Sequence, residues 1–417
     1  MTITPEPQQR ERPPVEDWST DFDHTDPQWS ADPYPIWDQL RDGCPMARTE
    51  RFGGTWLPTT HELISAIAYD TENFTSRSVV VGERRPTPED LPAPIGVAPP
   101  ITSDPPFHHL ARRIMLPAFS PKKIEELTPF TRELCNGLID KLVGAESVDA
   151  AVDYAQHIPV QVIAKMLGFP LEDADYFRHV IHLILEAGVT AEPEGEGRQA
   201  EADAIDAYFD AQIADHVENP RDDLTTFLLN AELDGNKLSH QHVRGTMILL
   251  LVAGIDTTWS AIGASIWHLA QSPDDRHRLT QDPAIWPFAI EEFLRAYAPV
   301  TMARMVAQEC EYAGRQLQVD DWVLLPFPAA NRDPEIFDRA DEFIIDRAEN
   351  RHLAFGLGIH RCLGSNLARM ELTVALEEWM RRIPDFELSG HETATWSTGQ
   401  VRGPRTLPLH VPGGVTA

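Results

Sequence analysis

The sequence predicts one mainly α-helical domain with a minor β region. From His108 onward, roughly two thirds of the chain shows helical periodicity, interrupted by clusters of Pro, Gly and Asp. Residues 304–327 and 396–411 have the composition of short strands, and the second of these reads as a hairpin. No internal repeat and no sharp change in composition divides the 417 residues, so the helices and strands are expected to share one core.

The N-terminal residues 1–28 are rich in Pro, Glu, Asp and Gln, and we expect them to form a mobile arm before a domain that spans residues 29–417. A first helix is predicted at Pro35–Asp42. Residues 79–104 contain many prolines and no helical period, which indicates a long loop, and long loops in compact domains are often functional. The polar residues 186–198 separate two helical segments and are expected to form a lid loop.

Charge and hydropathy exclude several classes of partner. The formal net charge of −30 opposes binding to nucleic acid and to anionic membranes. The most apolar stretch, Met247–Ala270, carries Asp256 at its centre, which argues against a membrane span and for a helix in the protein core. The first 20 residues lack the apolar segment of a signal peptide. We therefore expect a cytoplasmic protein that contacts neither membrane nor nucleic acid.

The ten residues FGLGIHRCLG, Phe355–Gly364, place Cys362 in a glycine-rich loop that opens a helix from about Leu363 to Met380. The positive N-terminus of that helix favours a thiolate, and a thiolate can be the axial ligand of a haem iron. Gly356 and Gly358 permit a tight turn close to a flat macrocycle.

Two further residues of this loop fit the same interpretation: Gly364 leaves room where the helix meets the macrocycle, and Phe355 can pack beside the sulfur. A structural cysteine beside a turn is the usual alternative for a lone Cys. It accounts less well for two glycines, a histidine and a third glycine at fixed offsets. The four cysteines are far apart and show no CxxC spacing, so zinc and iron–sulfur sites are not expected.

The segment LLLVAGIDTTW, Leu249–Trp259, places Asp256 and Thr257 in the middle of an apolar helix that starts near Ser239. Burying such groups without partners costs on the order of a few kcal/mol. The Thr257 hydroxyl competes for a backbone carbonyl and can loosen the helix beside Gly254. The two residues are either a proton relay or a kink with a satisfied Asp. These interpretations are close to even for the segment alone, and the thiolate loop favours the relay.

With these motifs in place, the chain resembles the cytochrome P-450 family of haem-thiolate monooxygenases, in its bacterial form. FGLGIHRCLG matches the family pattern FGxGxHxCxG at every specified position, and the resemblance covers residues 32–412. It implies a single-domain triangular prism with a long central helix over haem b (iron protoporphyrin IX). It also implies Cys362 as the iron ligand, His360 as a donor to a haem propionate, and Phe355 and Gly364 as neighbours of the haem.

Other motifs follow in the family's order. Residues 253–258 match the signature A/G-G-x-D/E-T-T, which implies Asp256 and Thr257 as the catalytic pair for dioxygen activation. SDPPFHHLARR matches DPPxHxxxR, which implies propionate contacts from His108 and Arg112, and Arg304 matches a third such residue. The residues that match the family's buried ExxR pair and its later arginine, with a structural role, are Glu292, Arg295 and Arg347.

The family places its substrate above the haem, between several separated segments. The residues that we expect to line this pocket are Val81, Val97, Val252, Ala253, Val300 and Met302. Apolar walls suit a compact apolar substrate, with a terpenoid or small aromatic favoured and a fatty acid or steroid as the alternative. Chain length and motif offsets are most similar to the camphor-hydroxylase-like branch, although the loop tyrosine of the camphor enzyme has no counterpart here.

The resemblance implies an enzyme that inserts one atom of dioxygen into its substrate. No GxGxxG fingerprint occurs, so electrons are expected from a ferredoxin and its NAD(P)H-dependent reductase on separate chains. A monomer is implied. A peroxygenase fed by hydrogen peroxide is disfavoured by the Asp–Thr pair. A non-enzymatic haem-binding sensor or carrier is the alternative from another class, and it would need the thiolate loop without that pair.

Overall fold

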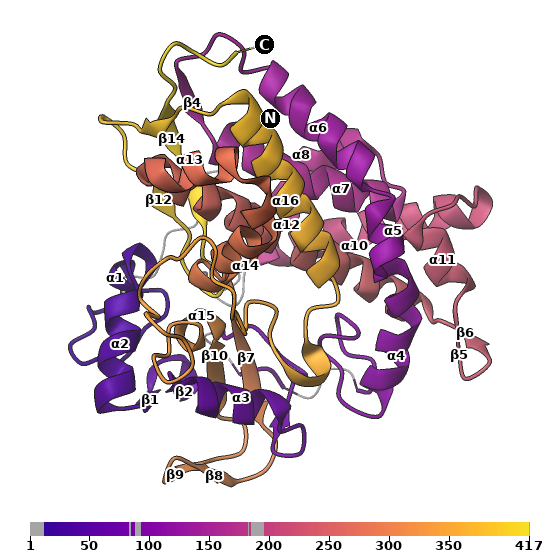
Figure 1. The fold of residues 1–417 in the computed structure, drawn as a ribbon. Helices are drawn as coiled ribbons and strands as arrows, with labels where there is room; N and C mark the ends of the chain where they lie inside the picture. The colour runs from indigo at the N-terminus through magenta and orange to yellow at the C-terminus, as the bar shows by residue number, and fades with distance from the viewer. Residues whose placement is uncertain (1–11, 83–84, 88–92, 182, 185–195, 417) are drawn as a thin grey trace.

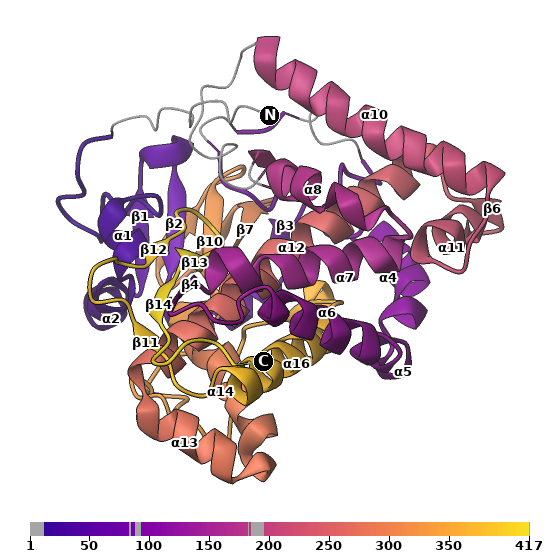
Figure 2. The same cartoon turned by 90° about the horizontal axis from the view of Figure 1, so that it is seen from above.

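In the computed structural model of the protein, the larger sheet lies at the lower left, below most of the helices, and the smaller strands lie among or beside helices (Figure 1). The structure describes residues 12–82, 85–87, 93–181, 183–184 and 196–416. Viewed from above, the larger sheet lies on one side, α10 (Glu196–Glu218) and α11 (Leu224–Asn230) lie on the opposite side, and α12 (His240–Gln271) runs between them (Figure 2). The mainly α-helical class with a minor β region is confirmed.

The remaining α-helices are short or of medium length, and α7, α8, α13, α14 and α16 among them pack against α12. They are α1 (Pro27–Ala31), α2 (Tyr34–Gly43), α3 (His61–Tyr69), α4 (Phe107–Met115), α5 (Pro121–Glu125), α6 (Thr128–Asp140), α7 (His157–Leu167), α8 (Ala174–Ile181), α13 (Pro273–Gln281), α14 (Trp286–Ala296), α15 (Phe327–Ala330) and α16 (Ser365–Arg382).

The strands form one larger sheet and several small ones. The larger sheet has the order β1-β2-β10-β7-β3, in which β2 and β10 are parallel and the other neighbours antiparallel. Its strands are β1 (Met46–Thr49), β2 (Thr55–Pro58), β3 (Phe74–Thr75), β7 (Thr301–Val306) and β10 (Trp322–Pro326).

A three-stranded sheet and three pairs complete the β region. The three-stranded sheet contains β11 (Glu387–Leu388), β14 (Pro408–His410) and β4 (Ser147–Asp149). The pairs are β5 (Glu232–Leu233) with β6 (Asn236–Lys237), β8 (Cys310–Tyr312) with β9 (Arg315–Leu317), and β12 (Thr395–Trp396) with β13 (Pro404–Thr406). The strands expected in residues 304–327 and the hairpin expected in residues 396–411 are therefore present.

The central helix α12 organises the helical core. It begins at His240, where the Ser239 hydroxyl accepts a hydrogen bond from the His242 amide, as expected for a helix that starts near Ser239. It is the one helix of the described residues that is long and apolar enough to cross a membrane. Its most apolar window is 61% buried, since α7, α8, α10 and α16 pack against it. This burial supports its interpretation as a core helix.

The N-terminal segment differs from the mobile arm that the composition suggests. Residues 1–11 lie outside the described residues. Within residues 12–28, Trp18 and Phe22 are buried in a second core, where the Trp18 and Trp29 rings lie 6.1 Å apart. Asp23 is paired with Arg12 at 3.0 Å and with Arg51 at 2.9 Å. Aromatic side chains and ion pairs anchor this segment, although its average composition is polar.

The two predicted loops, residues 79–104 and 186–198, have different outcomes. Between β3 and α4, the described residues of 79–104 form no helix or strand, in agreement with the predicted long loop. Most of the lid loop expected at residues 186–198 lies outside the described residues. The described part begins with α10 at Glu196.

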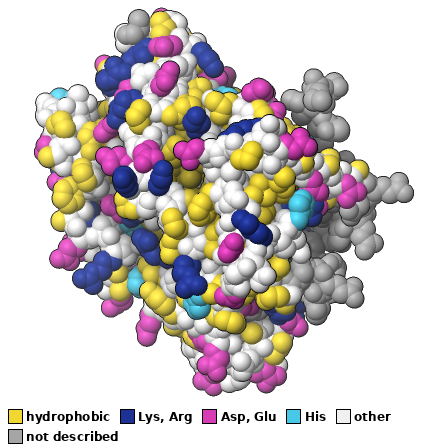
Figure 3. Space-filling model, turned by 90° about the vertical axis from the view of Figure 1, so that its right-hand side faces the viewer, with side chains coloured by type: hydrophobic (Ala, Val, Ile, Leu, Met, Phe, Trp, Pro, Cys, Tyr) yellow, Lys and Arg dark blue, Asp and Glu magenta, His cyan; other side chains and the backbone are white. Residues whose placement is uncertain are grey.

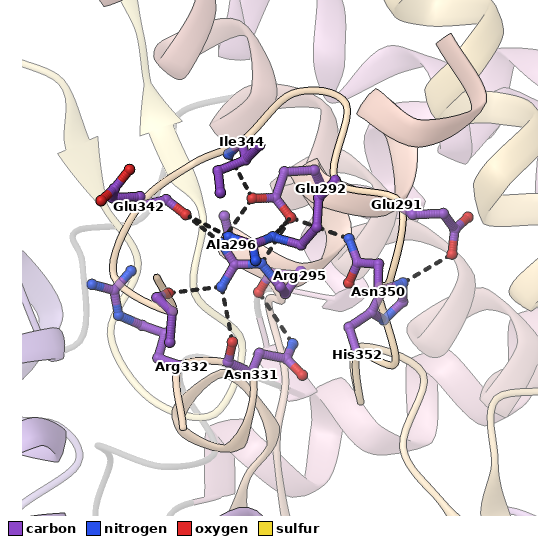
Figure 4. Close-up of polar contacts among 12 residues, drawn as sticks. Glu291, Glu292, Arg295, Ala296, Asn331, Arg332, Glu342, Ile344, Asn350 and His352 are labelled. Atoms are coloured by element: carbon purple, nitrogen blue, oxygen red, sulfur yellow. Dashed lines mark hydrogen bonds and ion pairs between the residues drawn. The ribbon is translucent and has the colours of Figure 1, made fainter. Parts of the chain in front are cut away.

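A buried ion network ties α14 to the irregular segment that follows α15 (Figure 4). Glu292 and Arg295 are fully buried, and their side chains meet through two hydrogen bonds of 2.8 Å. Arg347 approaches the same carboxylate at 3.1 Å, and the Ile344 amide and the Asn350 amide group also donate to it. The structure thus brings together all three residues assigned to the structural core.

Arg295 binds backbone carbonyls that lie 36 to 47 residues after it in the sequence. The Arg295 guanidinium donates to the carbonyls of Asn331, Ala340 and Glu342 at 2.7–2.9 Å. The Asn331 side chain in turn accepts from the Leu353 amide, at 2.6 Å. Since Leu353 lies directly before the cysteine loop, the network sets the position from which that loop starts.

We expect Glu292→Gln to lower the free energy of unfolding by about 3–5 kcal/mol, because the change leaves the buried Arg295 without a compensating charge. The measurement is urea unfolding of the purified protein. Glu342→Gln is the matched control, because Glu342 pairs with Arg339 at an exposed site where such pairs contribute less than about 1 kcal/mol. Equal losses in both variants would contradict a special role for the network.

Candidate active site

One cavity lies between α12 and the loop that carries Cys362. The residues that line it come from the loop before α4, from α4 and the turn after it, from α7, α12, α14 and α15, from residues 299–304, and from residues 354–368. They are Pro100, Ile101, Arg112, Met115, Phe119, Ile163, Thr246, Leu249, Leu250, Ala253, Gly254, Thr257, Thr258, Ala261, Leu294, Pro299, Val300, Met302, Arg304, Phe327, Ala354, Phe355, Gly356, Leu357, His360, Cys362, Leu363, Gly364, Leu367 and Ala368.

The loop of Cys362 has the tight geometry that its glycines predict. Gly356 and Gly358 have φ angles of 63° and 66°, in the left-handed region, and a Cβ at Gly358 would lie 2.8 Å from the Ala68 carbonyl. The Cys362 amide donates to the Phe355 carbonyl at 2.7 Å, which closes the loop. Gly364 precedes α16, so the sulfur lies at the N-terminal end of that helix.

Burial and nearby donors have opposing effects on the pKa of the Cys362 thiol. Burial raises the pKa of the Cys362 thiol, whereas the Gly364 amide and the guanidinium groups of Arg112 and Arg361 act in the opposite direction. Donors and positive charges around the sulfur stabilise an anion there. The Arg369 guanidinium adds to this effect and lies 4.4 Å from the centre of the Phe355 ring.

The α12 wall of the cavity follows a helical stripe. The α12 residues that line the cavity recur at spacings of three and four: Thr246, Leu249, Leu250, Ala253, Gly254, Thr257, Thr258 and Ala261. The Thr257 hydroxyl donates to the Ala253 carbonyl at 2.9 Å, the local backbone contact expected for a Thr at this position. Thr257 and Cys362 therefore border the same cavity.

Asp256 lies behind this wall. Its carboxylate is 1% exposed and forms an ion pair with Arg405 of β13 at 2.9 Å. The Arg405 guanidinium also lies 4.6 Å from the centre of the Trp259 ring. Arg405 could not be predicted from the sequence, because its partner is 149 residues away and no local pattern marks it. A buried carboxylate therefore lies next to the cavity, and the guanidinium that pairs with it comes from a strand far away in the sequence.

Two histidines and two arginines converge beside the cysteine loop. The His108 and His360 rings lie 4.3 Å apart. Burial lowers the pKa of His108 to about 4 and that of His360 to about 2, so both are neutral near pH 7. Arg112 and Arg304 line the cavity, and burial lowers the pKa of Arg304 to about 10 although Asp104 opposes the shift. The structure thus brings together the four predicted propionate contacts.

Part of the hydrogen-bonding capacity of these groups is unused within the described part of the chain. Both ring nitrogens of His108 and the Nε2 atom of His360 are buried without a hydrogen-bond partner among the described residues. The Arg304 guanidinium donates a hydrogen bond to the carbonyl of the neighbouring Ala303. Buried donors normally have partners. A planar group with two carboxylates would supply them, and haem b has this form.

The rest of the site also fits haem. Among the described residues, no group of three or more His, Cys, Asp or Glu side chains is placed to hold a metal ion. An iron bound to Cys362 would therefore need most of its ligands from a macrocycle, as in haem. Phe355 and Gly364, which were expected beside the haem, both line the cavity, and Gly364 presents no side chain toward the sulfur.

The predicted substrate-pocket residues divide into two sets. Ala253, Val300 and Met302 line the cavity, whereas Val81, Val97 and Val252 do not.

A physical reason explains why each of these three valines lies away from the cavity. Val81 is fully buried in the N-terminal aromatic core, where its amide donates to Gln400. Val97 has 52% of its surface exposed. Val252 is off the helical stripe that faces the cavity, since each residue of an α-helix is turned by about 100° from the one before.

Comparison with known proteins identifies the family that this site resembles. The family model described as Cytochrome P-450 matches residues 197–283 and 287–396. A mycinamicin IV hydroxylase/epoxidase from Micromonospora griseorubida is 33% identical over 380 residues, which cover 89% of this chain and 94% of the relative. A Pseudomonas protein named cytochrome P-450-terp is 30% identical and covers 90% and 92%, respectively.

Solved structures give the same result. A myxobacterial cytochrome P-450 in complex with myristic acid has a TM-score of 0.83 and 32% sequence identity, with coverage of 93% of this chain and 98% of that chain. A cytochrome P-450 from Bacillus megaterium in complex with testosterone has a TM-score of 0.82 and 28% identity, with coverage of 91% and 98%.

Proposed function

The chain belongs to the cytochrome P-450 family and is a monooxygenase with haem b as its cofactor, and we propose that it inserts one oxygen atom into a compact apolar substrate. The observation that carries the proposal is the cavity that Cys362 and Thr257 share. When bound, the haem supplies dioxygen binding and the redox chemistry of oxygen insertion. The chain supplies the groups that hold the cofactor, the substrate and the protons.

We propose that Cys362 ligates the iron and that His108, Arg112, Arg304 and His360 bind the two propionates. Neutral imidazoles can donate one hydrogen bond each, and guanidinium groups pair well with carboxylates. The buried nitrogens of His108 and His360 that have no partner among the residues the structure describes support this assignment.

The substrate side of the cavity supports an apolar substrate. Ile101, Leu249, Leu250, Val300 and Met302 contribute apolar side chains. The Thr246 and Thr257 hydroxyls are already used on the Pro99 and Ala253 carbonyls. Recognition would then rest on shape and on apolar burial, with few polar contacts.

A terpenoid or a small aromatic compound remains the favoured substrate. A fatty acid or a steroid is the second candidate, because two structurally similar proteins were solved in complex with myristic acid and with testosterone. The electron donors and the cytoplasmic location are proposed from the family.

Proton supply is proposed to run through α12. The Thr257 hydroxyl borders the cavity, and the Asp256 carboxylate follows it on the adjacent, buried side of the helix. Asp256 would take up a proton at a carboxylate oxygen, and the Thr257 hydroxyl would hold and pass a proton to the reacting oxygen. A positioned group of this kind contributes roughly 10²–10⁴-fold to a rate.

An acidic ferredoxin is proposed to dock on the face that carries α4 and α5, beside the cysteine loop. In Figure 3, Lys and Arg side chains lie on this side among Asp and Glu side chains. Arg113 on α4 and Lys122 on α5 are exposed. The Arg112 guanidinium donates to the Arg361 carbonyl at 2.5 Å, which joins α4 to the cysteine loop. Because the chain as a whole is acidic, a local basic cluster would direct an acidic partner to this face.

In Thr257→Ala, NADH consumption should continue while product per NADH falls about tenfold or more and hydrogen peroxide rises, because proton delivery is lost. The substrate for this test is the compound that gives the largest spin-state shift in a screen of terpenoids, small aromatics, fatty acids and steroids. Thr257→Ser is the matched variant and should keep its coupling, since it retains the hydroxyl. Unchanged product per NADH in Thr257→Ala would refute the relay, and no product from any bound ligand would favour a sensor or carrier.

The double variant Arg113→Glu/Lys122→Glu should slow reduction by ferredoxin about tenfold at low ionic strength and flatten its salt dependence, because electrostatic steering is reversed. Stopped-flow reduction is the measurement. Lys141→Glu is the control, since Lys141 is exposed at the opposite end of α6 from α5. Equal rates in the double variant and the control would contradict docking at this face.

A further inference from the structure

The loop of residues 95–103 is a compact unit that forms part of the cavity wall. The Thr102 hydroxyl accepts from the Ala98 amide at 2.9 Å, and the Thr102 amide donates to the Ala98 carbonyl at 3.2 Å. The Ser103 hydroxyl donates to the Ile95 carbonyl, which closes the loop at its base. Pro100 and Ile101 of this loop line the cavity. A displacement of the loop would therefore move the wall that contains these two residues.

The loop is docked on α12 at two consecutive residues. The Thr246 hydroxyl donates to the Pro99 carbonyl at 3.2 Å. Gly245 lies directly under the loop, and a Cβ at this position would lie 2.5 Å from the Val97 carbonyl oxygen and 2.9 Å from Pro99 Cδ. Both distances are shorter than real side chains adopt, so any residue other than glycine would push the loop away from the helix.

The sequence offers no other reason for a glycine here. Gly245 is in the interior of α12, where glycine is less favourable than alanine. Its φ is not in the left-handed region, so its backbone conformation does not require glycine. The close approach of the Val97–Pro99 backbone remains as the physical reason.

We propose that Gly245 is a specificity-determining residue, because the absence of its side chain sets how closely the wall of Pro100 and Ile101 stands over the cavity. This inference rests on the proposed function and adds to it the element that limits substrate size. A compact apolar ligand keeps its contacts with the wall only while the loop is docked. A bulky ligand gains room when the loop is displaced.

Two haem-ligating azoles test this without a known substrate: 4-phenylimidazole as the compact probe and a triphenylmethyl-substituted imidazole as the bulky one. Their dissociation constants are measured from the Soret shift of the ferric holoenzyme. In Gly245→Ala, the ratio of the two constants should move about tenfold toward the bulky azole, within the range by which hydrophobic pockets discriminate size. Gly137→Ala, also in a helix but with nothing within 4 Å of the new Cβ, should leave the ratio unchanged.

Amide hydrogen exchange gives a second readout that does not depend on ligands. Residues 97–103 should exchange faster in Gly245→Ala than in the wild type or in Gly137→Ala, because the loop has left the helix. If Gly245→Ala does not fold, Thr246→Val takes its place, since it removes the hydrogen bond to Pro99 at nearly constant shape and should shift the ratio in the same direction by a smaller factor.

The outcomes separate this inference from the proposed function. A ratio within twofold of the wild type, with unchanged exchange at residues 97–103, would overturn the role of Gly245. A wild-type protein that shows no Soret band after incubation with haem would instead overturn the haem site on which the proposed function depends.

Discussion

Arg295 carries a charge at a position with no exposed surface, and such a charge is tolerated only if the protein supplies what water would have supplied. Glu292 provides the countercharge, and three backbone carbonyls take the remaining donors. These carbonyls belong to the irregular segment between α15 and the cysteine loop, which has little regular structure of its own. The network therefore substitutes for a sheet or helix in holding the chain that leads to Cys362.

The buried ion network fixes the position of the cysteine loop, and the glycines of the loop determine its shape. Leu353 is fixed by Asn331, the turn follows at Gly356 and Gly358, and Cys362 closes on the Phe355 carbonyl. On the other wall, α12 presents one stripe to the cavity and its remaining faces to the helical core. Two rigid elements thus face each other, and a cluster of buried imidazoles and guanidinium groups marks where a dianionic cofactor would complete the electrostatics.

The sequence predicts best what is local. The glycine turn around Cys362, the capped start of α12 at Ser239 and the pairing of Glu292 with Arg295 each depend on neighbours within a few residues, and each is found in the structure. Contacts between distant segments were predicted only where the family resemblance supplied them, as for Arg347 with Glu292, and the others were missed. Arg405 reaches Asp256 across 149 residues, and the placement of Val81 and Val97 depends on how an irregular loop folds back.

Average composition was also a poor guide where a few side chains decide the outcome. Trp18 and Phe22 anchor an N-terminal segment that is otherwise polar, because two buried aromatic rings outweigh many exposed charges. The proposed role of Gly245 could not be predicted from the sequence either. Glycine matters at this position because residues 97–99 leave no room for a side chain, and that contact is known only from the structure.

The measurement that tests the central claim most directly is the carbon monoxide difference spectrum of the dithionite-reduced protein. Thiolate ligation by Cys362 predicts a Soret band shifted far to the red of that of histidine-ligated haem, together with loss of this band in Cys362→Ser. A band typical of histidine ligation, or a protein that binds no haem, would contradict the account.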